Sequence, residues 1–340
     1  MSRSISYTEV STALTCPAQW DFRYGGHLAG DALRSRVTAP ILREGRAWGA
    51  AVAAWHQHAD QMFARWDAQR ALIETVAADA KEMSEAGVPL DTEAQLAMEE
   101  RLMAMLEHYS SIAPPLLNLT RLEGEIDVPL WSRSSHRSSA RYRFLCRLDG
   151  LTVDHDGSKW LVEFKLRRDL TPVHLLQIMP QHRWYAWAYQ RETGDRIVGV
   201  LIDERVNAVP EAPRILANGK VSSDKRQVTT PELYVAACNE RGQLPEQEVV
   251  VNLEARRWQQ VSPIQFRQGE LEEAGAELVS AAKLIRDLDS GELAPIRNAR
   301  RANCNWCQFR HICPNPRDRL LVDVDFERIP PKRQRLEVAA

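Results

Sequence analysis

A short apolar run in the middle of the chain carries two opposite charges, and this combination sets the strictest limit on the fold. Residues 161–169 read LVEFKLRRD, which is typical of a strand with Glu163 and Lys165 two positions apart. Side chains two apart on a strand lie on one face, whereas Val162 and Phe164 face the other way. An exposed ion pair would explain this pattern, because such pairs are common and contribute little. On a buried strand, the same pair would indicate a functional site.

The segments around this strand predict a mixed α/β core at residues 120–210. EGEIDVPLW, ARYRFLCRLDGLTVDHDG and KWLVEFKL read as successive strands separated by Gly, Asp and Ser. PVHLLQIMPQHRWYAWAYQRETG then has helical periodicity and ends at a Gly. RIVGVLIDERV predicts one more strand.

The flanking regions predict a helical layer and a single domain over residues 1–318. Residues 40–115 are rich in Ala, with apolar residues three and four apart, which predicts an antiparallel helix pair broken at SEAGVPLD. Residues 211–231 are polar and aperiodic, which is typical of an exposed loop, and FRQGELEEAGAELVSAAKLIRDLDSGE predicts a long helix. Residues 1–25 predict a short helix, and residues 319–340 are expected to be a tail, whose basic PPKRQR segment predicts no fixed structure.

Charge and hydropathy exclude several classes of protein. The 44 Lys and Arg residues nearly balance the 46 Asp and Glu residues, so a nucleic-acid surface would have to be a local patch. No apolar run is long enough to span a membrane, and the first residues lack the apolar stretch of a signal peptide. The NGK tripeptide lacks the upstream Gly of a phosphate-binding loop, because position 214 is Arg. We therefore expect a cytoplasmic protein whose six cysteines are metal ligands or buried side chains rather than disulfides.

A second carboxylate is expected beside Glu163. Asp149 precedes it by fourteen residues, at the end of the preceding predicted strand. A hairpin that turns at DHDGS would bring the two strand ends together, so that Asp149, Glu163 and Lys165 converge. Two carboxylates form an oxygen site that suits Mg²⁺ or Mn²⁺, and Lys165 would orient or help to deprotonate an attacking water.

This arrangement resembles a known nuclease signature. Leu148-Asp149, followed by Glu163-Phe164-Lys165, is similar to the D…ExK motif of the PD-(D/E)XK nucleases, although the Pro of the family name is absent. The resemblance implies a restriction-endonuclease-like core, in which a mixed central sheet is flanked by helices. It also implies that Asp149, Glu163 and the Phe164 carbonyl hold the metal ion.

The helix after this strand strengthens the resemblance. QHRWY places Gln181 and Tyr185 one turn apart on one helix face, similar to the QxxxY element of the RecB-like branch of the superfamily. In that branch the element supports the active site and contacts the nucleic acid. An amphipathic helix with an incidental Gln and Tyr is the alternative. We expect Trp184, Trp187 and Tyr189 to pack in the core rather than to stack on bases.

Four cysteines at the two ends of the chain predict that the termini meet. CNWCQFRHICP contains Cys304, Cys307 and Cys313, and Cys16 is the obvious fourth ligand. RecB-like nucleases of the iron-sulphur type, including CRISPR-associated and helicase-partner exonucleases, have one cysteine before the nuclease core and three after it. This resemblance implies a [4Fe-4S] cluster and an iron-sulphur clasp that joins residues 1–25 to residues 295–318.

Zinc is the alternative for this site, because four thiolates also bind zinc, although zinc modules usually use two close cysteine pairs. With either metal, the site would be structural. Cys146 and Cys238 lack such spacing and are expected to be buried small side chains.

One position departs from the resembling family. That family often has a further His ligand, in a G-x-x-x-H context on the first long helix, where this chain has Gly49. His56 lies two turns further on, roughly 10 Å away at about 1.5 Å per residue, and could replace the missing ligand only if the helix were shifted. A structural role for His56 is the alternative.

Together these features predict a Mg²⁺- or Mn²⁺-dependent DNA exonuclease that acts on single-stranded ends in recombination, repair or CRISPR-type DNA processing. Arg167, Arg168 and Arg183 are candidate phosphate contacts. A helicase, a recombinase or a CRISPR adaptation protein are possible partners, and so is a second copy of the chain. One alternative is a DNA-binding or assembly subunit with a vestigial nuclease site, which Gly49 would suggest. Another is a zinc-stabilised regulator with an incidental ExK sequence.

Overall fold

The strand that carries Glu163 and Lys165 lies at the centre of a five-stranded sheet with the order β3-β6-β7-β8-β9. β7 and β8 are parallel, and the other pairs in this sheet are antiparallel. As predicted, β6 and β7 form a hairpin whose turn is closed by a hydrogen bond of 2.9 Å from Asp154 N to Ser158 O. The strands are β3 (Thr120–Arg121), β6 (Gly150–Val153), β7 (Lys159–Arg167), β8 (Ile197–Val206) and β9 (Gln259–Gln265).

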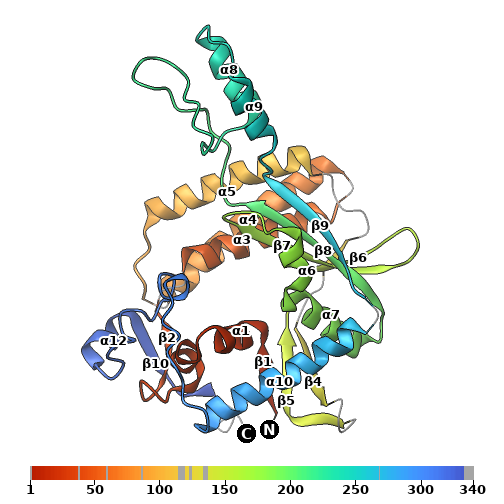
Figure 1. Ribbon diagram of the computed structural model, residues 1–340, viewed down its shortest axis with the longest axis vertical. Coiled ribbons are helices and arrows are strands. Elements are labelled where there is room, and N and C mark those ends of the chain that lie inside the picture. The colour runs from red at the N-terminus through yellow and green to blue at the C-terminus, as the bar shows by residue number, and fades with distance from the viewer. Residues whose placement is uncertain are drawn as a thin grey trace.

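The computed structural model describes residues 2–36, 39–58, 60–85, 87–113, 119–121, 125–132, 137–267 and 269–332. Besides the central sheet, it contains a three-stranded sheet, in which β1 (Arg3–Ser6) pairs with β5 (Arg137–Cys146) and β5 pairs with β4 (Ile126–Ser132). The described residues contain no helix that is long and apolar enough to cross a membrane. The architecture is the expected mixed α/β arrangement of helices and mixed sheets (Figure 1).

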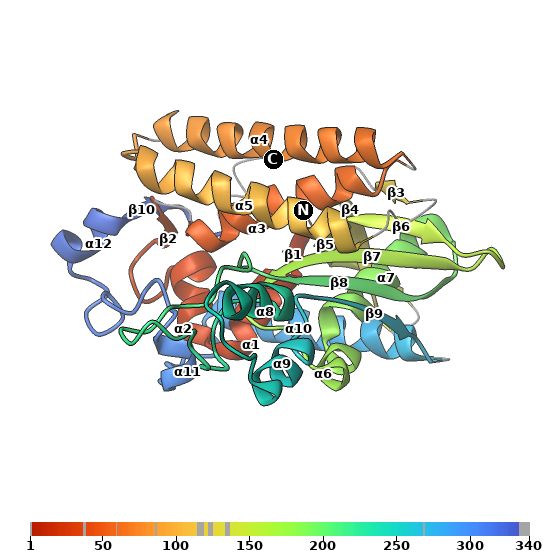
Figure 2. The same ribbon diagram turned by 90° about the horizontal axis from the view of Figure 1, so that it is seen from above.

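Three helices cover one face of the central sheet (Figure 2). They are α3 (Pro40–Trp55), α4 (Gln61–Glu85) and α5 (Thr92–Ile112), and they bury Val162 and Phe164 of β7. The predicted break at SEAGVPLD is confirmed, and the Asp91 side chain caps α5. The predicted helix pair is nevertheless three helices, because α3 ends at Trp55. The Asp60 carboxylate then accepts hydrogen bonds from Met62 N and Phe63 N and begins α4.

The opposite face of the sheet packs on α6 (Val173–Ile178) and α7 (Pro180–Thr193). α10 (Glu270–Ser290) packs on α7 and β4, and α1 (Tyr7–Thr15) packs on α10. The predicted crossover helix is interrupted at Met179, because Pro180 takes the first position of α7, and it ends at Gly194 as predicted. Trp184, Trp187 and Tyr189 are buried in this core, which confirms their packing role.

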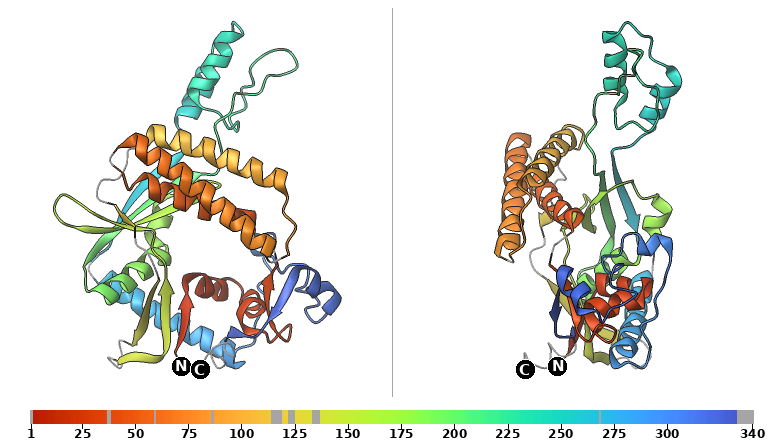
Figure 3. Two further views of the ribbon diagram at one scale, coloured as in Figure 1. Left: turned by 180° about the vertical axis from the view of Figure 1, so that it is seen from behind. Right: turned by 90° about the vertical axis from the view of Figure 1, so that its left-hand side faces the viewer.

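Residues 207–258 form an insertion between β8 and β9. It begins with the predicted loop at 211–231, in which Ile215 and Val221 form an isolated β-bridge. The helices α8 (Pro231–Glu240) and α9 (Gln247–Glu254) follow and share a small apolar core that includes the buried Cys238. Figures 1 and 3 show that this insertion projects from the rest of the chain.

The two ends of the chain meet, as the cysteine pattern predicts. Ala18 N donates to Ile296 O at 3.1 Å, and Asn298 Nδ2 donates to Thr15 O at 2.7 Å. β2 (Ala32–Ser35) pairs with β10 (Phe326–Ile329). The other elements here are α2 (Pro17–Trp20), the π-helix η1 (Asp21–Gly25), α11 (Arg301–Cys304) and α12 (Arg319–Asp325).

The tail expected at 319–340 is folded as far as residue 332. Its first part forms α12 and β10, and Lys332 Nζ donates to Ser4 O at 2.7 Å. Residues 333–340 lie outside the described residues. In residues 319–332, Val322 and Phe326 bury apolar surface against the amino-terminal segment. The second half of the basic PPKRQR segment lies outside the described residues.

Candidate active site

The candidate site forms where β6 ends beside β7. β6 begins at Gly150, opposite Val162, so its pairing with β7 stops before Glu163. Beyond this point the Asp149 side chain replaces the β6 backbone as hydrogen-bond partner, because its Oδ2 accepts a hydrogen bond of 2.9 Å from Phe164 N. The hairpin thus brings Asp149 beside Glu163 and Lys165, as predicted from the sequence.

Glu163 is the most buried member of the group, with 4% of its surface exposed. Its Oε1 accepts hydrogen bonds from Lys165 Nζ at 2.6 Å and from Gln181 Nε2 at 3.1 Å. Gln181 reaches it from α7, the helix that leads from β7 to the parallel strand β8. The pair is therefore part of a buried cluster and not an exposed ion pair on a solvated face.

Burial and neighbouring charges shift the pKa values of Glu163 and Lys165. Burial raises the pKa of Glu163 to about 7, against the effect of Lys165, and the nearby Asp149 carboxylate adds to the rise. Burial would lower the pKa of Lys165, but Glu163 and Asp149 more than offset it and raise this pKa above its usual range. Lys165 is therefore an ammonium at neutral pH, while a large fraction of Glu163 holds a proton.

The Phe164 carbonyl points to the same edge as the two carboxylates. In a strand, the N–H and C=O of one residue face the same neighbour, and Phe164 N faces Asp149. A cation at this edge would therefore find two carboxylates and one carbonyl oxygen, which are the ligands that Mg²⁺ and Mn²⁺ prefer. The described residues contain no group of three or more His, Cys, Asp or Glu side chains that could hold a metal ion. The candidate site has only two such side chains, Asp149 and Glu163, and its third oxygen ligand would be a backbone carbonyl.

A cavity of about 920 Å³ opens onto this edge, between α3 and the end of β7. Three arginines line its wall, and sequence reasoning identified only one of them. The other two could have been found from their positions in the sequence. Arg46 lies one turn before Gly49 on the same helix, and Arg147 lies two residues before Asp149. Among the residues that line the cavity are Arg46, Gly49, Arg147, Asp149, Lys165 and Arg167.

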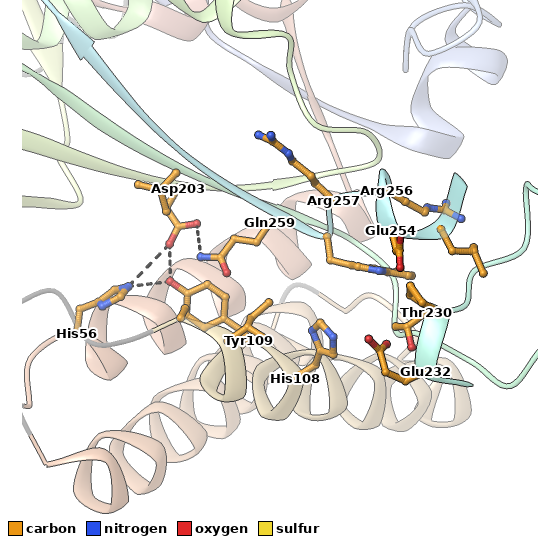
Figure 4. Close-up of a pocket in the computed structure, with 16 residues that line it drawn as sticks. His56, His108, Tyr109, Asp203, Thr230, Glu232, Glu254, Arg256, Arg257 and Gln259 are labelled. Carbon is orange, nitrogen blue, oxygen red and sulfur yellow. Dashed lines mark hydrogen bonds and ion pairs between the residues drawn. The ribbon is translucent and has the colours of Figure 1, made fainter. Parts of the chain in front are cut away.

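Gly49 faces this cavity, whereas His56 does not line it. A Cβ atom added at Gly49 would have no atom within 4 Å. His56 lies in a second cavity, where its Nε2 is 2.7 Å from the Tyr109 hydroxyl, and Tyr109 donates to Asp203 (Figure 4). His56 also stacks on the Phe164 ring, with centroids 5.4 Å apart. It is thus a buried structural residue that ties α3 and α5 to the sheet, and it does not take the place of a ligand at Gly49.

The two residues of the QxxxY pattern both lie behind Glu163. The Tyr185 hydroxyl interacts with the Gln181 side chain, and burial, together with Glu163, raises the pKa of Tyr185. Tyr185 also packs edge-on against Tyr7, with ring centroids 6.4 Å apart. This arrangement orients Gln181 toward the carboxylate.

His182, which the sequence gave no reason to select, is buried beside this group. Both of its ring nitrogens lack a hydrogen-bond partner among the described residues. Burial, together with the charges of Lys165 and Arg167, lowers the pKa of His182 to about 3. It is a neutral imidazole next to the site.

The three predicted phosphate contacts lie in different surroundings. Arg167 lines the cavity and pairs with Glu204 at 3.1 Å. Arg168 is exposed just beyond β7. Arg183 binds Glu277 of α10 at 3.1 Å, and the neighbouring Trp184 donates to the same carboxylate. Arg183 therefore joins α7 to α10 and does not line the candidate site.

The four predicted cysteine ligands lie in the same region, at the junction of the chain ends, but among the described residues they form no group that could hold a metal ion. Burial raises the pKa of Cys307, and the thiols of Cys16, Cys313 and Cys304 add to this rise. Arg297 Nε donates to the Cys313 carbonyl at 3.2 Å, which holds the carboxy-terminal loop in place. Cys146, by contrast, is buried in the core, as expected.

Comparison with known protein families identifies a match over most of the chain. A sequence model of the PD-(D/E)XK nuclease superfamily matches residues 4–314, nearly the whole chain, including the candidate site. No curated protein sequence matches.

Proposed function

The chain belongs to the PD-(D/E)XK nuclease superfamily, and from this premise we propose that it is a Mg²⁺- or Mn²⁺-dependent DNA exonuclease that acts on single-stranded ends. The observation that carries this proposal is the cluster of Asp149, Glu163 and Lys165 at the open edge of β7. Asp149 and Lys165 line a cavity of about 920 Å³, and Glu163 is buried next to them. Membership of the superfamily indicates a metal-dependent nuclease. The exonuclease mode and the choice of metal are part of the proposal.

The donor set fits a divalent cation. Asp149, Glu163 and the Phe164 carbonyl would hold it. Burial raises the pKa of Glu163 even though Lys165 is beside it, and a bound cation would stabilise the ionised carboxylate. When bound, such a cation stabilises the charge that develops on the phosphate and lowers the pKa of a nearby water.

The remaining residues of the site act on the phosphate and on Glu163. Lys165 keeps its proton, so it would donate hydrogen bonds to the attacking water or to a phosphate oxygen rather than accept a proton. The water oxygen would bond to phosphorus and lose a proton to solvent, the P–O bond to the leaving nucleotide would break, and the leaving oxygen would take up a proton from solvent. Gln181, held by Tyr185, would fix the orientation of Glu163.

A DNA strand is the substrate that the cavity wall supports best. Arg46, Arg147 and Arg167 line it, and arginine side chains commonly contact phosphate oxygens. Because the net charge of the whole chain is near zero, a DNA-binding surface has to be a local positive patch, and these arginines supply one. The cytoplasmic location, the recombination, repair or CRISPR-type setting and any helicase partner or second subunit remain part of this proposal.

The test compares linear and covalently closed circular single strands, each internally labelled, in Mg²⁺, Mn²⁺ or EDTA. An exonuclease degrades the linear strand and leaves the circle intact, and the Asp149→Asn variant degrades neither. Equal degradation of the circle would show an endonuclease. Activity that persists in EDTA or in Asp149→Asn would refute the assignment of the site.

Gly49 favours a second candidate, a DNA-binding subunit with a weakened nuclease site. The cavity offers open space there, and no side chain adds a ligand from this position. Such a protein would bind single-stranded DNA but would release no nucleotides with either metal. Intact Asp149, Glu163 and Lys165 support the nuclease over this alternative.

We also propose that Cys16, Cys304, Cys307 and Cys313 hold a [4Fe-4S] cluster that fastens the chain ends. The meeting of the chain ends supports this donor set, because the other three thiols are near enough to Cys307 to affect its pKa. The described thiols do not by themselves form a group that could hold a metal ion, so the side chains would have to rearrange around the cluster. Anaerobically purified protein should then be brown, with broad absorption near about 400 nm that Cys307→Ser loses. A colourless protein that contains one equivalent of zinc would show the zinc alternative instead.

A further inference from the structure

A third cavity, smaller than the two described above, adjoins the candidate active site. It has a volume of about 170 Å³ and lies where β2, α3, α4 and β10 meet. Figures 1 and 2 show the β2–β10 ribbon beside the beginning of α3. Arg46 lines both this cavity and the larger one that contains Asp149 and Lys165. The two cavities therefore share one wall.

Four arginines and three carboxylates line the small cavity: Arg34, Arg36, Arg43 and Arg46, with Asp79, Glu82 and Glu327. The carboxylates already have partners among these arginines. Arg34 pairs with Glu327 at 3.5 Å, and Arg46 pairs with Asp79 at 2.9 Å and with Glu82 at 3.7 Å. Within the part of the chain that the structure describes, Arg36 and Arg43 form no ion pair. Two guanidinium groups are thus left for an anion from outside.

The burial and the unpaired donor of Arg43 are the main evidence for such an anion. It is only 8% exposed, and its Nη2 donates to the neutral Gln95 Oε1 at 3.1 Å. Its buried Nε has no hydrogen-bond partner among the described residues, and neither does Asp79 Oδ2. A buried charge whose donor is unpaired costs free energy unless a ligand compensates it. The cavity therefore presents an unpaired cationic donor beside an unpaired acceptor.

We propose that this cavity binds a phosphoryl group of the DNA strand that is cut at Asp149 and Glu163. The proposal rests on the proposed nuclease function. At about 170 Å³ the cavity is smaller than the roughly 300 Å³ at which pockets for whole small molecules begin, so it fits one phosphoryl group with water. The guanidinium of Arg43 donates to the phosphoryl oxygens, and Arg36 adds charge at the rim.

The spacing along α3 sets how far this phosphoryl group lies from the cut. Arg43 precedes Gly49, which lines the larger cavity, by six residues, or about 9 Å along the helix. This distance places the phosphoryl group within a few nucleotides of the cut. The cavity would therefore bind the strand near the cut, either at its terminal phosphate or at an internal phosphate.

The test measures binding of a fluorescent oligothymidylate in EDTA, so that no cleavage is needed. Dissociation constants are measured over a series of salt concentrations for wild type, Arg36→Gln and Arg43→Gln, with Arg226→Gln in the projecting insertion as the control. Each lost phosphate contact should weaken binding and reduce the slope of log K against log salt by about 0.7. Arg36 is exposed, so its variant keeps the test valid if Arg43→Gln does not fold.

Strands with a 5′-phosphate, with a 3′-phosphate and with neither separate the two sources of the phosphoryl group. A preference for one phosphorylated end that the Arg36 variant loses identifies a terminal phosphate. A reduced slope without an end preference identifies an internal phosphate. Affinity and slope equal to those of Arg226→Gln would overturn the proposal, even if cleavage is intact. Conversely, binding that depends on the arginines without any metal-dependent cleavage would refute only the nuclease function.

Discussion

The raised pKa of Glu163 predicts that the affinity for Mn²⁺ decreases strongly as the pH falls from about 8.5 to about 5.5. In the folded, metal-free protein this pKa is about 7, compared with 4.5 for an unperturbed glutamate. A metal ion requires the ionised carboxylate, so it must displace the proton as the pH falls. The direction is therefore weaker binding in acid.

The size of this effect follows from the fraction of Glu163 that is ionised. With a pKa of about 7, only about 3% is ionised at pH 5.5, so the Mn²⁺ affinity should fall about 30-fold from its value at pH 8.5. With a pKa of 4.5, about 90% would still be ionised and the affinity would barely change. The two cases are thus easy to distinguish.

The same shift has a consequence for stability. Because the folded pKa lies above the unfolded one, the metal-free protein should lose stability as the pH rises from about 4.5 to 7, by about 3 kcal/mol. Bound Mn²⁺ should restore this stability at alkaline pH, because it binds only the folded site.

Calorimetric titration of metal-free protein with Mn²⁺, without DNA, measures the affinity directly. Glu163→Gln should lose most of the binding and its pH dependence, whereas the exposed control Glu240→Gln should behave like wild type. An affinity that changes less than about twofold over this pH range would refute the idea that Glu163 is a buried, partly protonated ligand.

Three further predictions address other parts of the molecule. Gln181→Leu removes a hydrogen bond that orients the site's buried carboxylate and should lower activity or Mn²⁺ affinity about 10- to 100-fold, measured by cleavage and by titration. Gly49→His should raise Mn²⁺ affinity about tenfold, because it adds an imidazole ligand to the open cavity, whereas Gly45→His, one turn away, should not. Tyr109→Phe deprives the buried Asp203 of a donor and should lower the free energy of unfolding by about 1–3 kcal/mol in urea, with no loss of metal binding.

Local sequence patterns were sufficient to predict the centre of the site. The alternation in LVEFKL places Glu163 and Lys165 on one face of β7, and the turn at DHDGS fixes the hairpin that brings Asp149 alongside. Helical spacing likewise aligned Gln181 and Tyr185 on α7. Each of these relations depends on residues that are close in sequence or joined by one short connection.

Features that depend on tertiary contacts could not be predicted in the same way. Asp149 lies at a switch between two sheets, because the chain leaves β5 of the three-stranded sheet just before it. His56 was expected on a continuing helix, but α3 ends at Trp55 and His56 turns toward Tyr109. The arginine-lined cavity combines side chains from four separate elements, and no local pattern marks such a meeting.

The most direct test of the account is cleavage of end-labelled single-stranded DNA by wild type and Lys165→Met, in Mg²⁺, Mn²⁺ or EDTA. Methionine keeps the shape of the side chain but removes the ammonium that hydrogen-bonds Glu163 at 2.6 Å. The account predicts metal-dependent trimming by wild type and a loss of at least about 100-fold in Lys165→Met, which should still bind DNA. Equal cleavage by the two proteins would contradict it, and so would the absence of any metal-dependent cleavage by folded wild type.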